Sequence, residues 1–184
     1  MVKIAMTGGI ACGKSLLSSY LRDLGVETLD ADDVVHALVP AEERRRLAKV
    51  VFADASARRA LEARLHPLVR ERIRAWFAEG GSAPKVAIIP LLFEVHWEAD
   101  YDIISCVVSS REKQIERMTA LRGYTREEAE ARLAAQMDVS EKAAKSQYVI
   151  RNDGSAAELR AEAEKFVSWL AQQQHGALFP KRRI

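Results

Sequence analysis

Short apolar runs alternate along this chain with longer segments of helical period. Five runs are typical of strands, and they cover residues 4–6, 26–29, 85–93, 103–108 and 148–150. The continuous runs at 85–93 and 103–108 suit strands buried on both faces. Between the five runs, apolar side chains recur every three or four residues, which is the spacing of one helix face. These helical segments cover residues 16–24, 34–38, 42–77, 110–122, 125–136 and 155–170. The alternation predicts an α/β fold with a five-stranded, mostly parallel sheet flanked by helices.

Capping and breaking residues refine these boundaries. Two helices are expected to open with a capping box, in which a Ser or Thr and a Glu three residues later satisfy free helix N–H groups; the pairs are Thr125 with Glu128 and Ser155 with Glu158. Within residues 42–77 we expect breaks near Asp54 and at Pro67, since proline disrupts a helix interior. Residues 181–184 are predicted to form a frayed tail.

Composition places the chain among ordinary globular proteins. Its 184 residues are 48% hydrophobic and 29% charged, which predicts one domain over residues 1–184 with a substantial core. A net charge of +2 argues against a dedicated nucleic-acid surface. No apolar run approaches the ~18 residues of a membrane span, and no cationic leader with an apolar segment opens the chain. With only two, widely separated cysteines, we expect a cytoplasmic protein without a disulfide framework.

The first strand and the first helix enclose a phosphate-binding motif. Four residues separate Gly8 from Gly13, and Lys14 and Ser15 follow, giving G-x-x-x-x-G-K-[ST] in its required context. Glycines permit the close approaches that let successive N–H groups cradle phosphate oxygens at the helix N-terminus. Lys14 adds a charge for the β- and γ-phosphates, and the Ser15 hydroxyl can ligate Mg²⁺. The alternative is a glycine-rich turn in which the lysine has no such role.

Carboxylates follow two of the predicted strands. Asp30 and Asp32 come directly after residues 26–29, and Glu94 ends residues 85–93. Ligands of parallel sheets bind beyond the carboxyl ends of the strands, so these groups are expected to share a crevice with the phosphate loop. An aspartate there can accept a proton from an attacking hydroxyl or hold Mg²⁺ through water. Helix capping is the alternative for all three carboxylates, and Asp33 is expected to point away or to cap the next helix.

Other candidates are less specific. Arginines over a transferring phosphoryl group would neutralise its charge, and a mobile lid can deliver them; the candidates are Arg117, Arg122, Arg126 and Arg132. Pairing with nearby glutamates on a solvated helix face explains such arginines equally well. His66 before Pro67 suits a local cap or a site residue. Cys12, inside the phosphate loop near a helix N-terminus, is expected to have a lowered thiol pKa and to react with alkylating agents unless ATP covers it.

The order of short motifs resembles the dephospho-CoA kinase family, within the nucleoside-monophosphate-kinase-like group of P-loop kinases. The resemblance covers nearly the whole chain. Its pieces are TGGIACGKS (7–15), LGVETLDADDV (24–34), LHPLV (65–69), IPLLFE (89–94), QIERMTALRG (114–123), ARLAAQ (131–136) and YVIRNDG (148–154). The phosphate loop alone is shared by many ATPases, whereas the whole series in this order is far more specific.

The resemblance implies transfer of the ATP γ-phosphate to the ribose 3′-hydroxyl of dephospho-CoA, the last step of coenzyme A biosynthesis, with Mg²⁺. It implies Asp32 as general base, with Lys14 and Arg117 also catalytic. The implied ATP-binding set is Gly9, Ala11, Cys12, Gly13, Lys14, Ser15, Leu16, Arg117, Arg122 in the lid, and Asn152 and Gly154 near adenine. The implied acceptor-binding set is Thr7, Asp30, Asp32, His66, Pro90 and Glu94. The expected parts are a core (1–35, 84–110 and 145–175), a helical acceptor-binding insertion (36–83) and a lid (111–140).

The sequence differs from the family pattern at two places, and two other functions are considered. Ala11-Cys12 replaces a small pair such as Gly-Ser, and the segment between Val39 and Glu43 is shorter than usual, which trims the acceptor-binding region. The nearest rival is another small-molecule P-loop kinase, acting on a nucleoside monophosphate, shikimate or gluconate. An NTP-hydrolysing switch is disfavoured, because no strand ends in a Mg²⁺-binding Asp and N-K-x-D is missing. We expect ATP and dephospho-CoA as partners, no nucleic acid or membrane, and a monomer or weak homo-oligomer.

Overall fold

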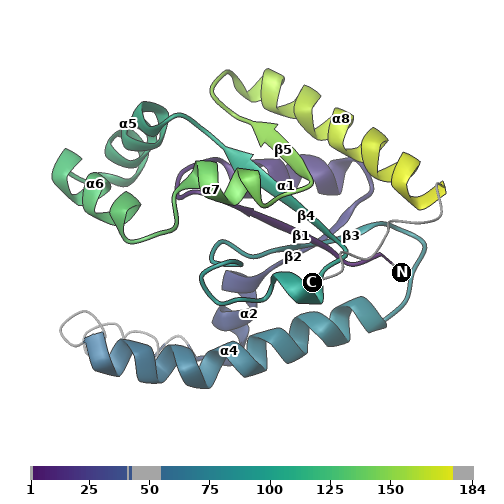
Figure 1. Ribbon diagram of the computed structural model, residues 1–184, viewed down its shortest axis with the longest axis horizontal. Coiled ribbons are helices and arrows are strands. Elements are labelled where there is room, and N and C mark those ends of the chain that lie inside the picture. The colour runs from purple at the N-terminus through teal and green to yellow at the C-terminus, as the bar shows by residue number, and fades with distance from the viewer. Residues whose placement is uncertain (1, 41, 43–54, 176–184) are drawn as a thin grey trace.

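A five-stranded parallel sheet forms the centre of the computed structural model, which describes residues 2–40, 42 and 55–175 (Figure 1). The strand order is β2-β3-β1-β4-β5. The strands are β1 (Ile4–Gly8), β2 (Glu27–Asp30), β3 (Lys85–Ile88), β4 (Ile103–Val108) and β5 (Tyr148–Arg151). The central strand β1 pairs with both β3 and β4, so the phosphate loop that follows it leaves from the middle of the sheet. The predicted α/β class and the five-stranded parallel sheet are confirmed.

Helices cover both faces of this sheet. Figure 1 shows α8 and α4 on opposite sides of the strands, with α5 and α6 grouped at one end. The helices are α1 (Lys14–Asp23), α2 (Ala31–Leu38), α4 (Ala55–Ala78), the 3₁₀ turn η1 (Glu98–Asp100), α5 (Arg111–Arg122), α6 (Arg126–Ala134), α7 (Val139–Ala144) and α8 (Ala156–His175). Both predicted capping boxes form: Thr125 N donates to Glu128 and Ser155 N donates to Glu158, and each serine or threonine hydroxyl accepts in return.

Each face of the sheet has its own hydrophobic core, because successive strand side chains point to opposite sides. Ile4 and Met6 pack toward α1 and α8, in a cluster that includes Leu17 and Phe166. Ala5, between them, belongs to the second cluster, with α2, α4 and the loop after β3. All five residues of β1 are buried. All residues of β3 and β4 are buried as well, so these strands are covered on both faces.

Helix α4 corrects the break expected at Pro67. The helix runs from Ala55 to Ala78 with Pro67 inside it. Proline removes one backbone hydrogen bond and crowds the preceding turn, but Val69 and Ile73, directly after it, are buried against the second core. Their packing holds the helix together across the proline. The break expected near Asp54 and the tail at 181–184 lie outside the described residues.

The strand expected over residues 85–93 is also shorter than predicted. β3 ends at Ile88, and the Ile89 N–H still donates to Met6 O at 2.8 Å before the chain turns. Pro90 has no N–H with which to continue the ladder. Leu92 and Phe93 are buried as a loop rather than as a strand. Hydrophobicity alone could not separate these two ways of burying the run.

A carboxylate shared by two arginines fastens α4 to the turn before β4. Asp100 Oδ1 accepts from Arg70 Nη2 and from Arg74 Nη2, both at 2.8 Å, and the Asp100 side chain is only 16% exposed. The hydrogen bond from Arg70 is the main reason why the pKa of Asp100 lies below its usual range. Because the folded-state pKa is the lower one, the contact stabilises the fold above the unfolded-state pKa and is lost as pH falls through the folded-state pKa.

We expect Asp100→Asn to lower the free energy of unfolding by about 1–3 kcal/mol at neutral pH, the worth of hydrogen bonds to a charged group. Urea denaturation of both proteins at neutral pH and near pH 3, below the ordinary aspartate pKa of about 3.9, measures the effect. The difference between them should shrink at the acidic pH. Glu79→Gln is the matched control, since its pair with Arg72 is exposed at the surface. A loss of equal size at both pH values would contradict the assigned contact.

Candidate active site

The phosphate loop joins β1 to α1 through backbone conformations that favour glycine. Gly13 has φ 89°, and a Cβ there would lie 2.2 Å from Asn152 Nδ2. A Cβ on Gly8 would lie 2.3 Å from Val107 O of the neighbouring strand. Ala11 adopts φ 58°, a left-handed conformation that L residues seldom take. The two glycines of the motif are therefore required by close neighbours as well as by backbone angle.

Side-chain donors hold every carbonyl of the loop from residue 8 to residue 12. Lys14 Nζ donates to Gly8 O and Gly9 O at 3.0 and 2.8 Å. The remaining donors come from distant segments: Gln114 Nε2 to Ile10 O at 2.7 Å, Arg117 Nη1 to Ala11 O at 3.2 Å and Asn152 Nδ2 to Cys12 O at 2.9 Å. With the carbonyls held by these donors, the loop N–H groups are left to face an anion at the start of α1.

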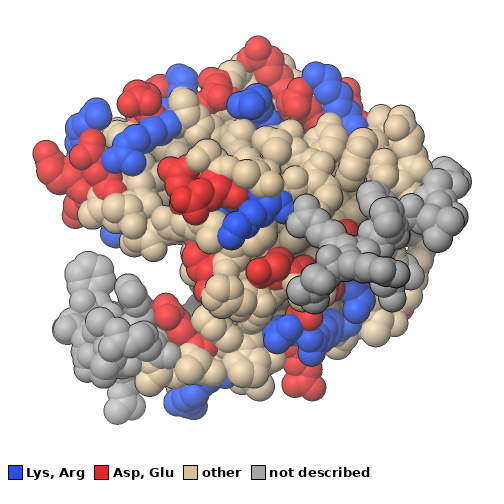
Figure 2. Space-filling view, viewed as in Figure 1, with Lys and Arg blue, Asp and Glu red and all other residues tan. Residues whose placement is uncertain are grey.

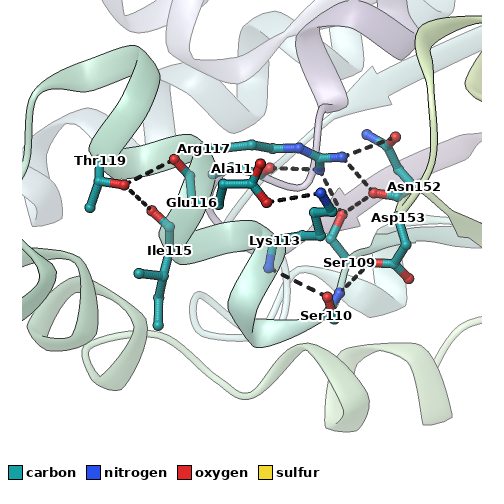
Figure 3. Close-up of polar contacts among 10 residues, drawn as sticks. All are labelled: Ala11, Ser109, Ser110, Lys113, Ile115, Glu116, Arg117, Thr119, Asn152 and Asp153. Carbon is teal, nitrogen blue, oxygen red and sulfur yellow. Dashed lines mark hydrogen bonds and ion pairs between the residues drawn. The ribbon is translucent and has the colours of Figure 1, made fainter.

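Arg117 braces the loop in this structure (Figure 3). Besides Ala11 O, its guanidinium donates to Ser109 Oγ at 2.8 Å and to Asn152 O at 2.7 Å. Ser109 Oγ in turn donates to Asn152 O at 2.6 Å. Arg117 therefore ties the phosphate loop to the segment after β5. These bonds use Nη1 and Nη2 and leave the Nε–H of Arg117 for the phosphate contact that the resemblance implies.

At the end of β2 the two candidate aspartates have different environments. Asp30 is the N-cap of α2, and its Oδ1 accepts from Asp32 N at 2.9 Å. The cap is thus Asp30, so of the two outcomes expected for Asp33 capping is not found, and its side chain is exposed in the first turn of α2. Burial raises the pKa of Asp30, and the charge of Lys14 is among the smaller effects that oppose that rise. Because β1 and β2 both pair in parallel with β3, the end of β2 lies at the same edge of the sheet as the phosphate loop. Asp32 lies in the first turn of α2 with an exposed side chain.

Three residues implied for the acceptor side lie together. Thr7 Oγ1 donates to Pro90 O at 3.1 Å, and Glu94 closes the same loop, 89–94. Sequence reasoning missed the group that joins them: Lys142 of α7 pairs with Glu94 at 2.7 Å and donates to Pro90 O at 2.8 Å. Lys142 is completely buried. Nothing in its short polar helix distinguishes it from an exposed lysine.

His66 lies apart from this group. Its ring packs edge-on against Trp97 with centroids 5.8 Å apart. Both line a hollow of about 450 Å³ whose other walls are Pro67, Arg70, Glu71 and Arg74. Within residues 2–40 and 55–175, no hydrogen bond or ring contact joins His66 to the phosphate loop or to Asp32. An acceptor-side role for His66 stays a prediction.

The arginines of the expected lid lie on α5 and α6, which in Figure 2 overhang a hollow of the molecular surface. Arg126 Nε pairs with Glu130 at 3.1 Å, and the Arg132 guanidinium lies 4.2 Å from the centre of the Tyr124 ring. Arg122 is exposed at the end of α5. The contacts of Arg126 and Arg132 therefore match the alternative of a solvated helix face.

Cys12 does not have the environment expected for a reactive thiol. It is fully buried within the first core cluster, and burial raises its pKa despite the nearby charge of Lys14. Cys106, also buried, has its pKa raised to about 12. The expectation of a lowered pKa, which rested on the helix N-terminus alone, is wrong because desolvation outweighs that field.

We therefore expect iodoacetamide to label neither cysteine of the native protein at an appreciable rate at neutral pH, with or without ATP. Mass spectrometry of labelled peptides should show both cysteines modified once the chain is unfolded in urea. Rapid modification of native Cys12 that ATP prevents would contradict this expectation. It would mean that the thiol reaches the nucleotide site.

A phosphate-binding loop after the central strand of a five-stranded parallel sheet, with carboxylates beside it, defines a P-loop kinase. The dephospho-CoA kinase family model matches residues 2–44 and 40–158. A dephospho-CoA kinase of Symbiobacterium thermophilum is 38% identical over 195 aligned positions, covering 91% of this chain and 80% of the relative. The chain belongs to the dephospho-CoA kinase family. The predictions of family and of a kinase of coenzyme A biosynthesis are confirmed.

Solved structures agree in fold. A crystal structure from Thermus thermophilus has a TM-score of 0.76 at 34% identity and covers 93% of this chain and 97% of its own. The dephospho-CoA kinase of Campylobacter jejuni has a TM-score of 0.70 at 24% identity, covering 94% and 98%. Among the described residues, no helix is both long and apolar enough to span a bilayer.

The comparisons also bear on the shortened segment. The two matched pieces of the family model meet at residues 40–44, directly after Val39. The alignment to the Symbiobacterium relative has more positions than this chain has residues, so the relative contains residues that this chain lacks. Within and after this segment, residues 41 and 43–54 lie outside the described residues.

Proposed function

We propose that this kinase transfers the γ-phosphate of ATP to the ribose 3′-hydroxyl of dephospho-CoA at the crevice between the phosphate loop and the start of α2. One observation carries the proposal: Asp32, exposed in the first turn of α2, directly follows β2, whose carboxyl end lies at the same edge of the parallel sheet as the phosphate loop. Asp32 then orients the acceptor hydroxyl and takes its proton, while Lys14 and the loop N–H groups neutralise the transferring phosphoryl group. Family membership supports the choice of acceptor.

Ser15 is the proposed protein ligand for Mg²⁺. It follows Lys14 at the start of α1, and its side chain is exposed. No cluster of three or more His, Cys, Asp or Glu side chains suited to a metal is found among the described residues. A single hydroxyl fits Mg²⁺, which keeps several waters and takes its other ligands from substrate phosphates. When bound, the ion would offset the negative charge of the ATP phosphates.

The nucleotide base is proposed to lie over the segment after β5. Asn152 and Gly154 belong to this segment, and the Arg117 guanidinium donates to Asn152 O at 2.7 Å. A planar guanidinium offers its face for stacking. A Cβ on Gly154 would lie 2.2 Å from Glu158 Oε2, so this glycine also makes room for the capping box of α8. Leu16, Gly9 and the remaining loop residues complete the proposed ATP set.

The rest of the prediction also stays a proposal. Residues 36–83 would bind the acceptor and residues 111–140 would form the lid. Both cysteines are free and buried, which suits the proposed cytoplasmic location. A monomer or weak homo-oligomer is expected.

A coupled assay for ADP release tests the function. We expect ADP release from ATP with dephospho-CoA and only background release with water, shikimate, gluconate or AMP. Kinases acting on gluconate and shikimate share the fold, at 16% identity each, so they provide the relevant alternative acceptors. Turnover with one of these and not with dephospho-CoA would contradict the proposal. ADP release independent of any acceptor would favour a nucleotide-hydrolysing switch.

A further inference from the structure

Lys142 is a buried cation to which the proposed reaction gives no role. The side chain, on α7, has no exposed area. A lysine this deeply buried needs an anion and acceptor oxygens to offset the loss of hydration. It finds them in Glu94 Oε1 at 2.7 Å and Pro90 O at 2.8 Å. Both belong to the loop after β3, so one ammonium group holds that loop at two points.

The same loop is anchored from the strand that leads into the phosphate loop. Pro90 O accepts from Thr7 Oγ1 as well as from Lys142. A second contact links α7 to the loop, since Lys145 Nζ lies 5.5 Å from the centre of the Phe93 ring. The charge of Lys142 also helps to lower the pKa of Lys14, behind the larger effect of burial. Through Pro90 O, Lys142 is linked to Thr7, the residue that precedes Gly8 of the phosphate loop.

Glu94 has one oxygen engaged and one without a partner. Oε1 accepts from Lys142 and also from Met137 N at 3.1 Å. Oε2 is buried, and it has no hydrogen-bond partner among the described residues. Leaving a buried carboxylate oxygen without a donor is costly, and such groups in native proteins point to a missing partner. The acceptor is the molecule proposed to bind at this loop, and its hydroxyl and N–H groups are donors of the required kind.

We propose that Lys142 is a positioning residue for the acceptor: it fixes the 89–94 loop and turns Glu94 so that Oε2 accepts a hydrogen bond from a hydroxyl or N–H group of the acceptor. The proposal rests on the proposed function and adds a residue to it. Lys142 and Met137 flank the end of the expected lid. Met137 N, which also donates to Glu94 Oε1, belongs to the expected lid, whereas Lys142 follows its last residue by two positions.

Kinetics of Lys142→Met test this role. The variant removes the charge and keeps the length of the side chain. We expect KM for dephospho-CoA to rise about 10–100-fold, which corresponds to one lost hydrogen bond to a charged group. KM for ATP and kcat should change less than about threefold, since ground-state binding of one substrate is what the substitution removes. Lys165→Met, on the exposed face of α8, is the matched control.

A second variant separates positioning from mere stability. Lys142→Met leaves Glu94 buried without its cation, which lowers thermal stability. In Lys142→Met combined with Glu94→Leu both charges are gone, so stability should recover while KM for dephospho-CoA stays high. Recovery of both quantities, or an unchanged acceptor KM in folded variants, would overturn the proposal. If the wild type releases no ADP with dephospho-CoA, the proposed function itself is wrong, which is a different result.

Discussion

Asp32→Asn should lower kcat by about 10²–10⁴-fold, the usual cost of losing a general base. Its carboxylate is exposed in the first turn of α2, whereas the Asp30 carboxylate caps that helix. Phosphoryl transfer has a loose transition state, so the base mainly orients the hydroxyl and takes the proton late. Asn cannot take that proton, but it keeps the size of the side chain. ATP binding, measured by titration calorimetry, should be unchanged.

Asp33→Asn is the matched control for this variant, because it removes the neighbouring exposed carboxylate of the same helix turn. Asn caps helices as well as Asp does, so Asp30→Asn tests the charge of Asp30 without removing the cap. Normal turnover of Asp32→Asn together with a large loss in Asp30→Asn would show that the base is Asp30. If neither variant loses activity, the aspartates serve only the start of α2.

Lys14→Met should reduce kcat by about 10³-fold, near the upper end of the cost of removing one group that stabilises transition-state charge. Lys14 Nζ holds the carbonyls of Gly8 and Gly9, and burial lowers its pKa. An incoming phosphate would draw the ammonium away from those carbonyls, since a charged acceptor binds it more strongly than a carbonyl does. The substitution removes the ammonium group, and with it both the carbonyl contacts and the contact to the phosphate. Turnover under saturating ATP and acceptor measures the loss.

Thermal unfolding separates this effect from loss of fold. The methionine side chain fits the space of the lysine stem, so the core should keep its stability, and Lys165→Met again provides the control. Near-normal turnover of Lys14→Met would remove the basis for a kinase assignment at this loop. A collapse of thermal stability would show instead that the two carbonyl contacts hold the loop together.

Local patterns predicted the elements whose signals are local. The five apolar runs marked the strands, and the capping boxes at Thr125 and Ser155 marked two helix starts, because capping depends on residues three apart. The predictions at Pro67 and at residues 89–93 were wrong, because packing against distant residues determines whether the helix continues and where the strand ends. Val69 and Ile73 hold α4 together across the proline, and the apolar run after Ile88 is buried as a loop. Neither outcome is encoded in neighbouring residues.

The residues of the site also separate into those that local spacing predicts and those whose contacts depend on distant parts of the chain. The phosphate loop and the aspartates after β2 could be found from spacing, whereas the partners of those groups could not. The pKa of Cys12 depends on how deeply the loop is buried. The carboxylate that caps α2, by accepting from Asp32 N, is that of Asp30. Gln114 and Lys142 hold backbone carbonyls far away in the sequence. Such contacts produce no recognisable sequence pattern, because any side chain with a hydrogen-bond donor can bind a backbone carbonyl.

The carbonyl contacts of the phosphate loop set when the chain can first bind nucleotide during synthesis. The donors to Ile10 O and Cys12 O are 104 and 140 residues away in the sequence. A nascent chain that has emerged only through β4 contains the complete G-x-x-x-x-G-K-S motif but lacks Gln114, Arg117 and Asn152. Long-range pairings of this kind form late, after the entropy of closing the intervening chain has been overcome. Nucleotide affinity therefore arises only when β5 has left the ribosome, and a ribosome-bound chain that retains an ATP analogue has completed its sheet.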